Sequence, residues 1–126
     1  MMNYKLPKSE RLHAQKSIKE LFNEGSSFFL YPFKVLYLIK KQDGETNQIL
    51  FSVSKKKIKK AVNRNLIKRR MKESYRLNKH SLPNLEAGLH IGLIYVASEP
   101  LDFATISKKV VSILQQISTQ VSEHHE

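Results

Sequence analysis

The sequence predicts an α+β fold, a two-layer sandwich in which helices cover a mostly antiparallel sheet. Residues 9–24 and 102–120 carry apolar side chains at helical spacing. Residues 28–40 and 89–97 are rich in the aromatic and β-branched side chains that favour strands. The elements follow one another in the order α-β-β-α-β-α, with one more strand if the first extended stretch divides in two. This order describes a sheet covered by helices.

Length and composition predict a single domain over residues 1–126. Apolar residues make up 40% of the chain and charged residues 26%, which is typical of a globular protein. Residues 1–8 are expected to form an extended arm, because Pro7 delays the start of a helix. Residues 121–126 are expected to form a frayed tail.

The first helix is predicted over residues 9–24. Ser9 is a suitable N-cap, and Gly25 is expected to supply a left-handed stop. Apolar side chains form a broken helical stripe along this segment: Leu12, Ile18, Leu21 and Phe22.

A hairpin is predicted to follow the first helix. Residues 28–40 have strand propensity, and Pro32 within them indicates an edge position or a bulge. Residues 42–45 form a turn, and residues 47–54 form the returning strand.

The second half of the chain is predicted to contain two helices around one strand. A basic loop leads into a helix over residues 59–78, and residues 81–88 form a connection. Residues 89–97 are a nearly continuous apolar run, which indicates a strand buried on both faces. The last helix is predicted over residues 102–120.

The net charge of the chain lies in residues 55–79. This segment holds 12 of the 22 lysines and arginines and one acid, Glu73, so its charge equals the +11 of the whole chain. Each cation that meets a phosphate releases a condensed counterion, so a cluster of this density favours a polyanion. The first hypothesis is therefore binding to nucleic acid.

A helical wheel divides the basic segment into two faces. At about 100° per residue, apolar side chains from Val62 to Leu77 fall in one half. Arg70 is an exception, since it also falls in the apolar half and must reach past the helix edge. The other half presents a stripe of polar side chains about four turns long: Arg64, Asn65, Lys68, Arg69, Lys72 and Arg76.

A solvated face and a membrane-surface helix are the two alternatives to polyanion binding for this stripe. A face kept only for solubility usually interleaves Glu with Lys. Here ten cations between residues 55 and 72 have no acid among them, so they repel one another until a partner neutralises them. A membrane-surface helix is disfavoured, because the apolar face is needed for the core and carries no Trp or Phe anchor.

Several function classes are disfavoured by what the sequence lacks. Cysteine is absent, which excludes disulfides and thiolate chemistry. We expect a cytoplasmic protein with no membrane partner, because no signal-like run or window of ~18 apolar residues occurs. The acids are scattered and the histidines His13, His80 and His90 show no ligand spacing. A metal-dependent nuclease is therefore disfavoured, and no catalytic or metal-binding residue is predicted.

The segment 51–73 resembles the conserved strand, loop and basic helix of the protein subunit of bacterial ribonuclease P. This helix carries the family's RNR motif. Arg11-Leu12, Phe22 and the strand that ends at residues 95–97 also agree, so the resemblance spans about residues 8–118. The matching residues are Phe51-Ser52-Val53-Ser54-Lys55-Lys56-Lys57, Lys60-Ala61-Val62, Arg64-Asn65, Lys68-Arg69 and Lys72-Glu73.

Three positions depart from the family's pattern. Leu66 stands where the RNR triplet has its second arginine, and Lys72 stands where an arginine is expected near the end of the motif. Lysine keeps the charge but lacks the planar fork that binds a phosphate through two hydrogen bonds. Ile18 stands where many members have an aromatic residue. These changes concern the strength of individual contacts.

The resemblance implies an unusual left-handed crossover from the strand at residues 49–54 through the basic helix to the next strand. It also implies that the protein assists a cleavage that it does not perform. A large catalytic RNA with bound Mg²⁺ hydrolyses the bond between the 5′ leader and the mature tRNA. The expected partners are that RNA and the leader of precursor tRNA, and no cofactor is expected on the protein itself.

The resemblance also assigns the site residues. A cleft between the sheet and the first helix would hold the single-stranded leader on Phe22, Ile18 and Tyr37, or on a neighbouring strand aromatic. The residues alone leave three points open. Phe22 could belong to the core, and the faces that residues 33–37 present are not fixed. The chain could also be a ribosomal or general RNA-binding protein. Contacts with RNA are expected from a mobile lysine approach and from the helix: Lys55, Lys56, Lys57, Lys60, Arg64, Asn65, Lys68, Arg69 and Lys72.

Overall fold

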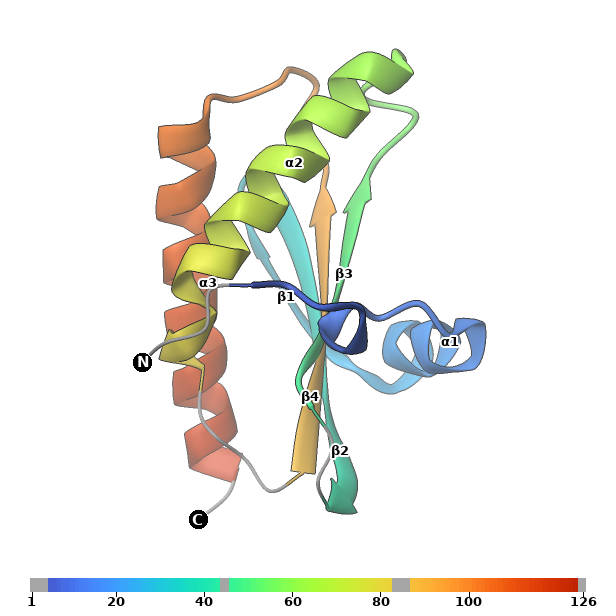
Figure 1. Ribbon diagram of the computed structural model, residues 1–126, viewed down its shortest axis with the longest axis vertical. Helices are drawn as coiled ribbons and strands as arrows, with labels where there is room; N and C mark the ends of the chain where they lie inside the picture. Colours follow the sequence, from blue (N-terminus) through green and yellow to red (C-terminus); the bar gives the residue numbers. More distant parts are fainter. Residues whose placement is uncertain (1–4, 44–45, 83–86, 125–126) are drawn as a thin grey trace.

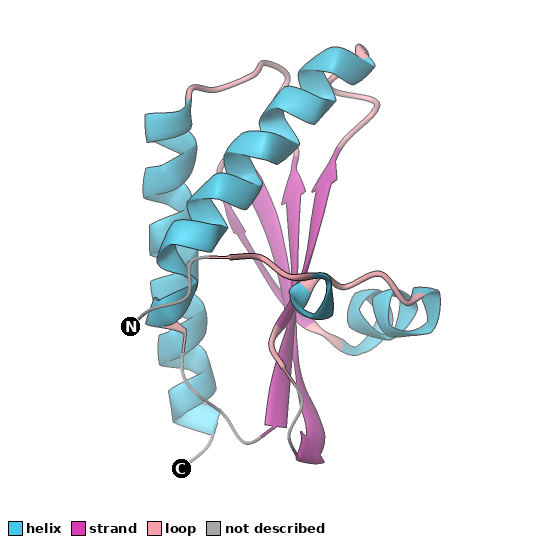
Figure 2. Cartoon of the chain, in the orientation of Figure 1, coloured by secondary structure: helices cyan, strands magenta, loops and turns pink. Residues whose placement is uncertain are grey.

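The computed structural model describes residues 5–43, 46–82 and 87–124. They form three α-helices, four strands and two short 3₁₀ turns, so the predicted α+β class is confirmed (Figure 2). In chain order the elements are η1 (Lys8–Glu10), α1 (Gln15–Glu24), β1 (Ser26–Leu30), β2 (Phe33–Asp43), β3 (Gln48–Val53), α2 (Ala61–Asn78), η2 (Lys79–Ser81), β4 (Ala87–Tyr95) and α3 (Phe103–His124).

The strands form one mixed sheet in the order β1-β2-β4-β3. β2 pairs antiparallel with both β1 and β4, whereas β3 pairs parallel with β4, so the sheet is mostly antiparallel as predicted. The predicted hairpin between residues 28–40 and 47–54 is wrong, because β4 lies between β2 and β3. Residues 89–93 of β4 are all buried, and a strand that is apolar on both faces gains most from this central position.

Pro32 explains why the first extended stretch divides in two. β1 ends at Leu30 and β2 begins at Phe33, so Pro32 lies in the turn between them and not at a bulge or in an edge strand. The Tyr31–Pro32 peptide bond is cis. The backbone N–H of Val96 donates to the Pro32 carbonyl at 2.9 Å, which ties this turn to the end of β4.

The first helix begins later than predicted, at Gln15 rather than at residue 9. The preceding residues run along the outer edge of β3 instead. Arg11 forms an isolated parallel bridge with Ile49, and the Leu12 N–H donates to the Ile49 carbonyl at 2.8 Å. Ser9 therefore lies in η1 and is not an N-cap, because pairing with the open edge of the sheet replaces the first turns of the predicted helix.

Gly25 ends α1 for a different reason from the one predicted. Its φ of −70° and ψ of 154° are extended, so it supplies no left-handed stop. Its role is spatial, because a Cβ there would lie 2.5 Å from the Leu21 carbonyl oxygen and 3.0 Å from that of Tyr37. Only glycine lets the chain turn this closely from α1 into β1.

The two faces of the sheet are covered by different helices. One side, the helix-pair face, packs against α2 and α3, and its strand residues include Val35 and Ile91. The other side, the α1 face, holds a smaller cluster of Leu12, Leu21 and Leu36. α1 therefore lies on the opposite side of the sheet from α2 and α3 (Figure 1).

The connection from β3 through α2 to β4 joins two parallel neighbours. In Figure 1 both strands point upward and α2 lies in front of them, with β4 to the left of β3. This crossover is left-handed, as the resemblance implied, although right-handed crossovers dominate in proteins.

Four predicted segments extend outside the described residues: the arm (1–8), the turn (42–45), the connection (81–88) and the tail (121–126). α3 continues to His124, so it is longer than the predicted helix over residues 102–120. α2 begins at Ala61 and ends at Asn78, close to the predicted 59–78.

Candidate nucleic-acid interface

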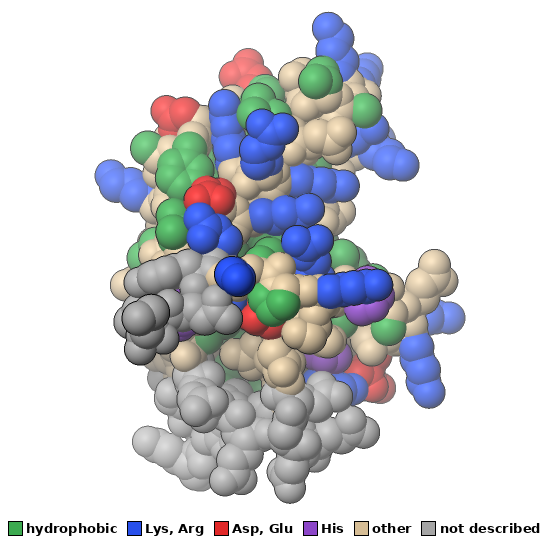
Figure 3. Space-filling model, viewed as in Figure 1, with side chains coloured by type: hydrophobic (Ala, Val, Ile, Leu, Met, Phe, Trp, Pro, Cys, Tyr) green, Lys and Arg blue, Asp and Glu red, His purple; other side chains and the backbone are tan. Residues whose placement is uncertain are grey.

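α2 separates its apolar and cationic side chains much as the helical wheel predicts. Ile67, Met71 and Tyr75 are fully buried against the sheet and α3. Val62 and Leu77, near the two ends of α2, are exceptions, since they are 71% and 43% exposed. Along the outward side, lysines and arginines form a continuous band over α2 (Figure 3).

Four of the predicted RNA contacts line one groove between α2 and the N-terminal segment. The groove has a volume of about 470 Å³. It is formed because residues 5–14 cross the edge of β3 and lie beside the outer face of α2. The side chains that line it are Leu6, Arg11, Asn65, Lys68, Arg69, Lys72, Glu73 and Arg76.

Arg11 adds a cation to this groove that was not among the predicted contacts. The sequence signal was its place beside Leu12 in the family resemblance. Its position depends on the bridge between Arg11 and Ile49, which no local pattern predicts. Cations from the N-terminal segment and from α2, which are more than 50 residues apart in the chain, thus line the same groove.

Arg64 lies at the start of the stripe but is partly engaged within the protein. Its Nη1 donates to the carbonyl oxygens of Ile58, at 3.0 Å, and Lys59, at 2.7 Å. Arg64 therefore holds the end of residues 55–60, the lysine loop, against the first turn of α2.

The backbone of the lysine loop is hydrogen-bonded to Ser54, although its lysine side chains are exposed. The N–H of Lys57 donates to the Ser54 Oγ at 3.3 Å, and the N–H of Ile58 donates to the Ser54 carbonyl at 2.9 Å. The buried side chain of Ile58 anchors the loop in the core. Lys55 and Lys56, like Lys57, thus lie exposed on a turn.

The N-terminus of α2 adds to the positive potential of this end. Lys60 occupies the N-cap position without a side-chain cap, and the first turn contains no acid. The exposed N–H groups of a first turn carry partial positive charge. Lys60 and the lysine loop therefore add their charges to the positive end of the helix dipole.

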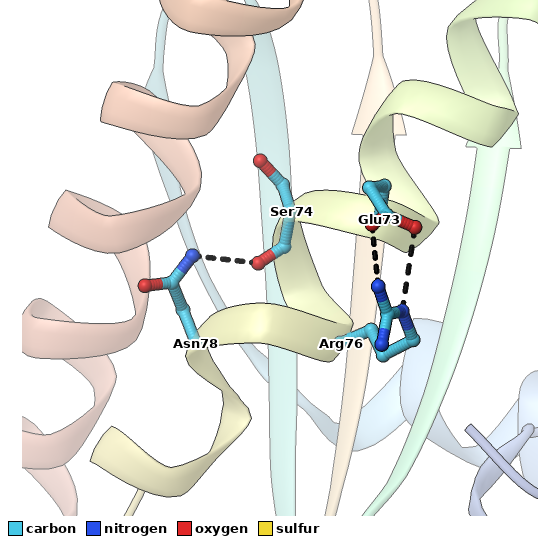
Figure 4. A network of polar contacts seen from close by, with 4 residues as sticks. All are labelled: Glu73, Ser74, Arg76 and Asn78. Atoms are coloured by element: carbon cyan, nitrogen blue, oxygen red, sulfur yellow. Dashed lines mark hydrogen bonds and ion pairs between the residues drawn. The ribbon is translucent and has the colours of Figure 1, made fainter. Parts of the chain in front are cut away.

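The cationic stripe is partly neutralised at the other end of α2. Glu73 forms an ion pair with Arg76, with a second contact from Nε to Oε2 at 3.3 Å (Figure 4). The hydrogen bond from Arg76 lowers the pKa of Glu73, and the same contact raises the pKa of Arg76. The unneutralised part of the stripe therefore ends at Lys72.

Two further contacts near this end of α2 are structural. The Asn78 Nδ2 donates to the Ser74 carbonyl at 2.7 Å, which closes the last turn of the helix (Figure 4). Arg70, the exception on the helical wheel, donates from Nη1 to the Leu101 carbonyl at 2.5 Å. It secures the connection before α3 and does not belong to the stripe.

α1 forms a second candidate surface beside a partly uncovered region of the sheet. Leu21 points at the sheet, and Glu20 pairs with Lys40 near the end of β2. Ile18 and Phe22 lie roughly 160° around the helix from Glu20, so they face the other way, toward the half of the α1 face where β2 begins. Phe22 is 47% exposed, so it is not core.

Tyr37 does not belong to this second surface, and its prediction as a cleft residue is wrong. It is 6% exposed and lies on the helix-pair face, where its hydroxyl donates to the Gln120 Oε1 at 2.6 Å. Val35 and Tyr37 share one face of β2, whereas Leu36 faces α1. In space-filling view the outline is hollowed between α1 and the cationic band of α2 (Figure 3).

No cluster of three or more His, Cys, Asp or Glu side chains that could hold a metal occurs within residues 5–43, 46–82 and 87–124. Nor does any helix in that part of the chain have the length and apolarity needed to cross a membrane. His90 is buried on β4, and His13 is exposed, with its ring 2.9 Å from the Arg11 carbonyl.

The fold and this surface define a small, basic α+β protein with a cationic helix in a left-handed crossover and a second helix on the opposite sheet face. The sequence model of the family Ribonuclease P matches residues 6–118. The chain therefore belongs to the ribonuclease P protein family.

Individual relatives agree with this membership. The chain is 36% identical over 121 residues to the ribonuclease P protein component of Porphyromonas gingivalis, across 92% of this chain and 88% of the relative. It is 36% identical over 124 residues to that of a Geobacter species, across 97% and 90%. The solved RNase P protein from Thermotoga maritima superposes with a TM-score of 0.70 at 29% identity, covering 85% of this chain and 96% of that one.

Proposed function

We propose that this chain is the protein subunit of a cytoplasmic ribonuclease P. In this role it binds a large catalytic RNA through α2 and holds the 5′ leader of precursor tRNA on the α1 face. The RNA subunit, with Mg²⁺, hydrolyses the bond that releases the leader. The protein contributes binding and charge neutralisation and supplies no catalytic residue.

The observation that carries this proposal is the groove along α2. Asn65, Lys68, Arg69 and Lys72 lie together there with Arg11, and the one acid in the groove, Glu73, is paired with Arg76. Such a surface neutralises several phosphates at once, and each phosphate contact releases a counterion. Membership in the ribonuclease P protein family supports the ribonuclease P RNA as this polyanion.

The α1 face supports the second part of the proposal. Phe22 and Ile18 offer exposed or half-exposed apolar surface beside the sheet. Stacking on an aromatic ring tolerates every base, because each base has a π-face. This property suits a subunit that must accept leaders of many sequences.

A general RNA-binding or ribosomal protein would also need a basic groove, so the identity of the bound RNA is the decisive test. We expect a tagged copy purified from cells at moderate salt to retain one large structured RNA together with precursor tRNA. Sequencing of the bound RNA checks this expectation. Recovery of ribosomal RNA without that large RNA would support the rival function instead.

A further inference from the structure

The α1 face extends beyond α1 to the outer edge of the sheet, and that edge carries an exposed aromatic ring. Phe29 on β1 is 62% exposed. Its partner across the strand pair is Lys34 on β2, which is exposed as well. Neither residue was among the predicted contacts.

The strand register shows that Phe29 and Lys34 lie on the α1 face. Phe28, the neighbour of Phe29, packs on the helix-pair face, where its ring lies 6.3 Å from that of Tyr37. Phe33 and Val35 on either side of Lys34 are fully buried in the same core. Because strand side chains alternate, Phe29 and Lys34 must point to the opposite side.

The row that contains Phe29 continues across the whole sheet. Lys34 pairs with Ile94 on β4, and Ile94 pairs with Ser52 on β3. Ile94 and Ser52 are half-buried, so α1 leaves this row partly open. α1 is centred on the adjacent row, where Leu21 lies over Gly92.

Phe29 could also contact the leader beyond the point where the leader contacts Phe22. Phe22 is close to the end of α1 at Glu24, and β1 follows at Ser26. From Ser26 to Phe29 the strand advances by about 10 Å, roughly three times the 3.4 Å spacing of stacked nucleotides along one strand. We expect a base on Phe29 to belong to a different nucleotide from a base on Phe22.

We propose that Phe29 and Lys34 form a second, outer contact for the leader, in which a base stacks on Phe29 and Lys34 neutralises a neighbouring phosphate. The inference rests on the proposed function of the α1 face. The pairing of a ring with a cation on neighbouring strands fits an unpaired nucleotide, which offers a base and a phosphate together. The outer contact makes affinity depend on whether a leader is long enough to reach the β1 edge.

The test uses the holoenzyme reconstituted with its RNA subunit and precursor tRNAs whose leaders grow one nucleotide at a time. With the unmodified protein, affinity should rise in steps as the leader lengthens. Phe29→Ala should remove one step of about tenfold, within the range of base–aromatic stacking, and leave the affinity for shorter leaders unchanged. Lys34→Ala should lower the salt dependence for long leaders by about one counterion.

Matched variants separate this contact from general effects. Phe103→Ala removes an exposed aromatic ring on α3, and Lys108→Ala removes an exposed α3 lysine, and neither should change the length dependence. If the Phe29→Ala curve superposes on the unmodified one while Phe22→Ala lowers it, the outer contact is wrong and the proposed leader surface stands. If affinity does not depend on leader length even for the unmodified protein, the proposed leader function itself fails.

Discussion

Replacing Lys68 and Arg69 together with alanine should lower affinity for the catalytic RNA by roughly tenfold to thirtyfold at about 0.15 M salt. Both side chains line the groove between α2 and the N-terminal segment. The loss of two phosphate contacts should reduce the slope of log affinity against log salt by nearly two. The variant and the unmodified protein should therefore converge as salt approaches about 1 M. Filter binding over a salt series measures both quantities.

Lys108 and Lys109 provide the matched control for this double variant. They are also adjacent lysines on a helix, and their replacement by alanine changes the net charge by the same amount. They lie on α3, away from the groove. If the Lys108→Ala/Lys109→Ala protein loses as much affinity and slope as the α2 variant, binding depends on net charge alone and the groove is not the interface.

Replacing Gly92 with leucine should displace α1 and remove the dependence of affinity on the leader. A Cβ added at Gly92 would lie 3.3 Å from the Leu21 side chain and 3.6 Å from that of Leu36. A leucine overpacks this site, which typically costs about 1–3 kcal/mol of the free energy of unfolding. Urea denaturation should show the loss of stability. Lengthening the leader should no longer increase the affinity of the holoenzyme for precursor tRNA.

Two further measurements separate displacement of α1 from a general loss of folding. Affinity for the catalytic RNA should be retained, because α2 packs on the other face of the sheet. Gly92→Ala should have a much smaller effect on both stability and the leader, since Leu21 needs to move by only a few tenths of an ångström. If the Gly92→Leu protein binds long leaders as the unmodified protein does, the position of α1 on the sheet is not what creates the leader surface.

The parts of the fold that follow from local periodicity were predictable. α2 and α3 bury one stripe each, and an apolar stripe at helical spacing is visible in the sequence without knowledge of the partner. The charge of residues 55–79 predicts a polyanion partner, and four of its twelve cations line the groove: Lys68, Arg69, Lys72 and Arg76. The family resemblance supplied the crossover, which physical rules alone would have predicted with the opposite hand.

The parts that depend on distant contacts were not predictable. β3 pairs with β4 because a doubly buried strand takes the centre of the sheet, and turn residues between β2 and β3 carry no information about this. The resemblance assigned Tyr37 to the cleft, and Pro32 left open which face each strand residue presents. A shift of one residue exchanges the two faces of a strand. Arg11 and Gly25 take their roles from β3 and from the Tyr37 carbonyl, which lie far away in the sequence.

The most direct test of the central claim is the magnesium dependence of precursor tRNA cleavage with and without this protein. RNA folded around a scissile phosphate repels itself, and the cations of α2 should replace part of the Mg²⁺ that otherwise screens it. Half-maximal cleavage by the RNA subunit should therefore need less Mg²⁺ when the protein is present. Magnesium curves that coincide with and without the protein would contradict the account.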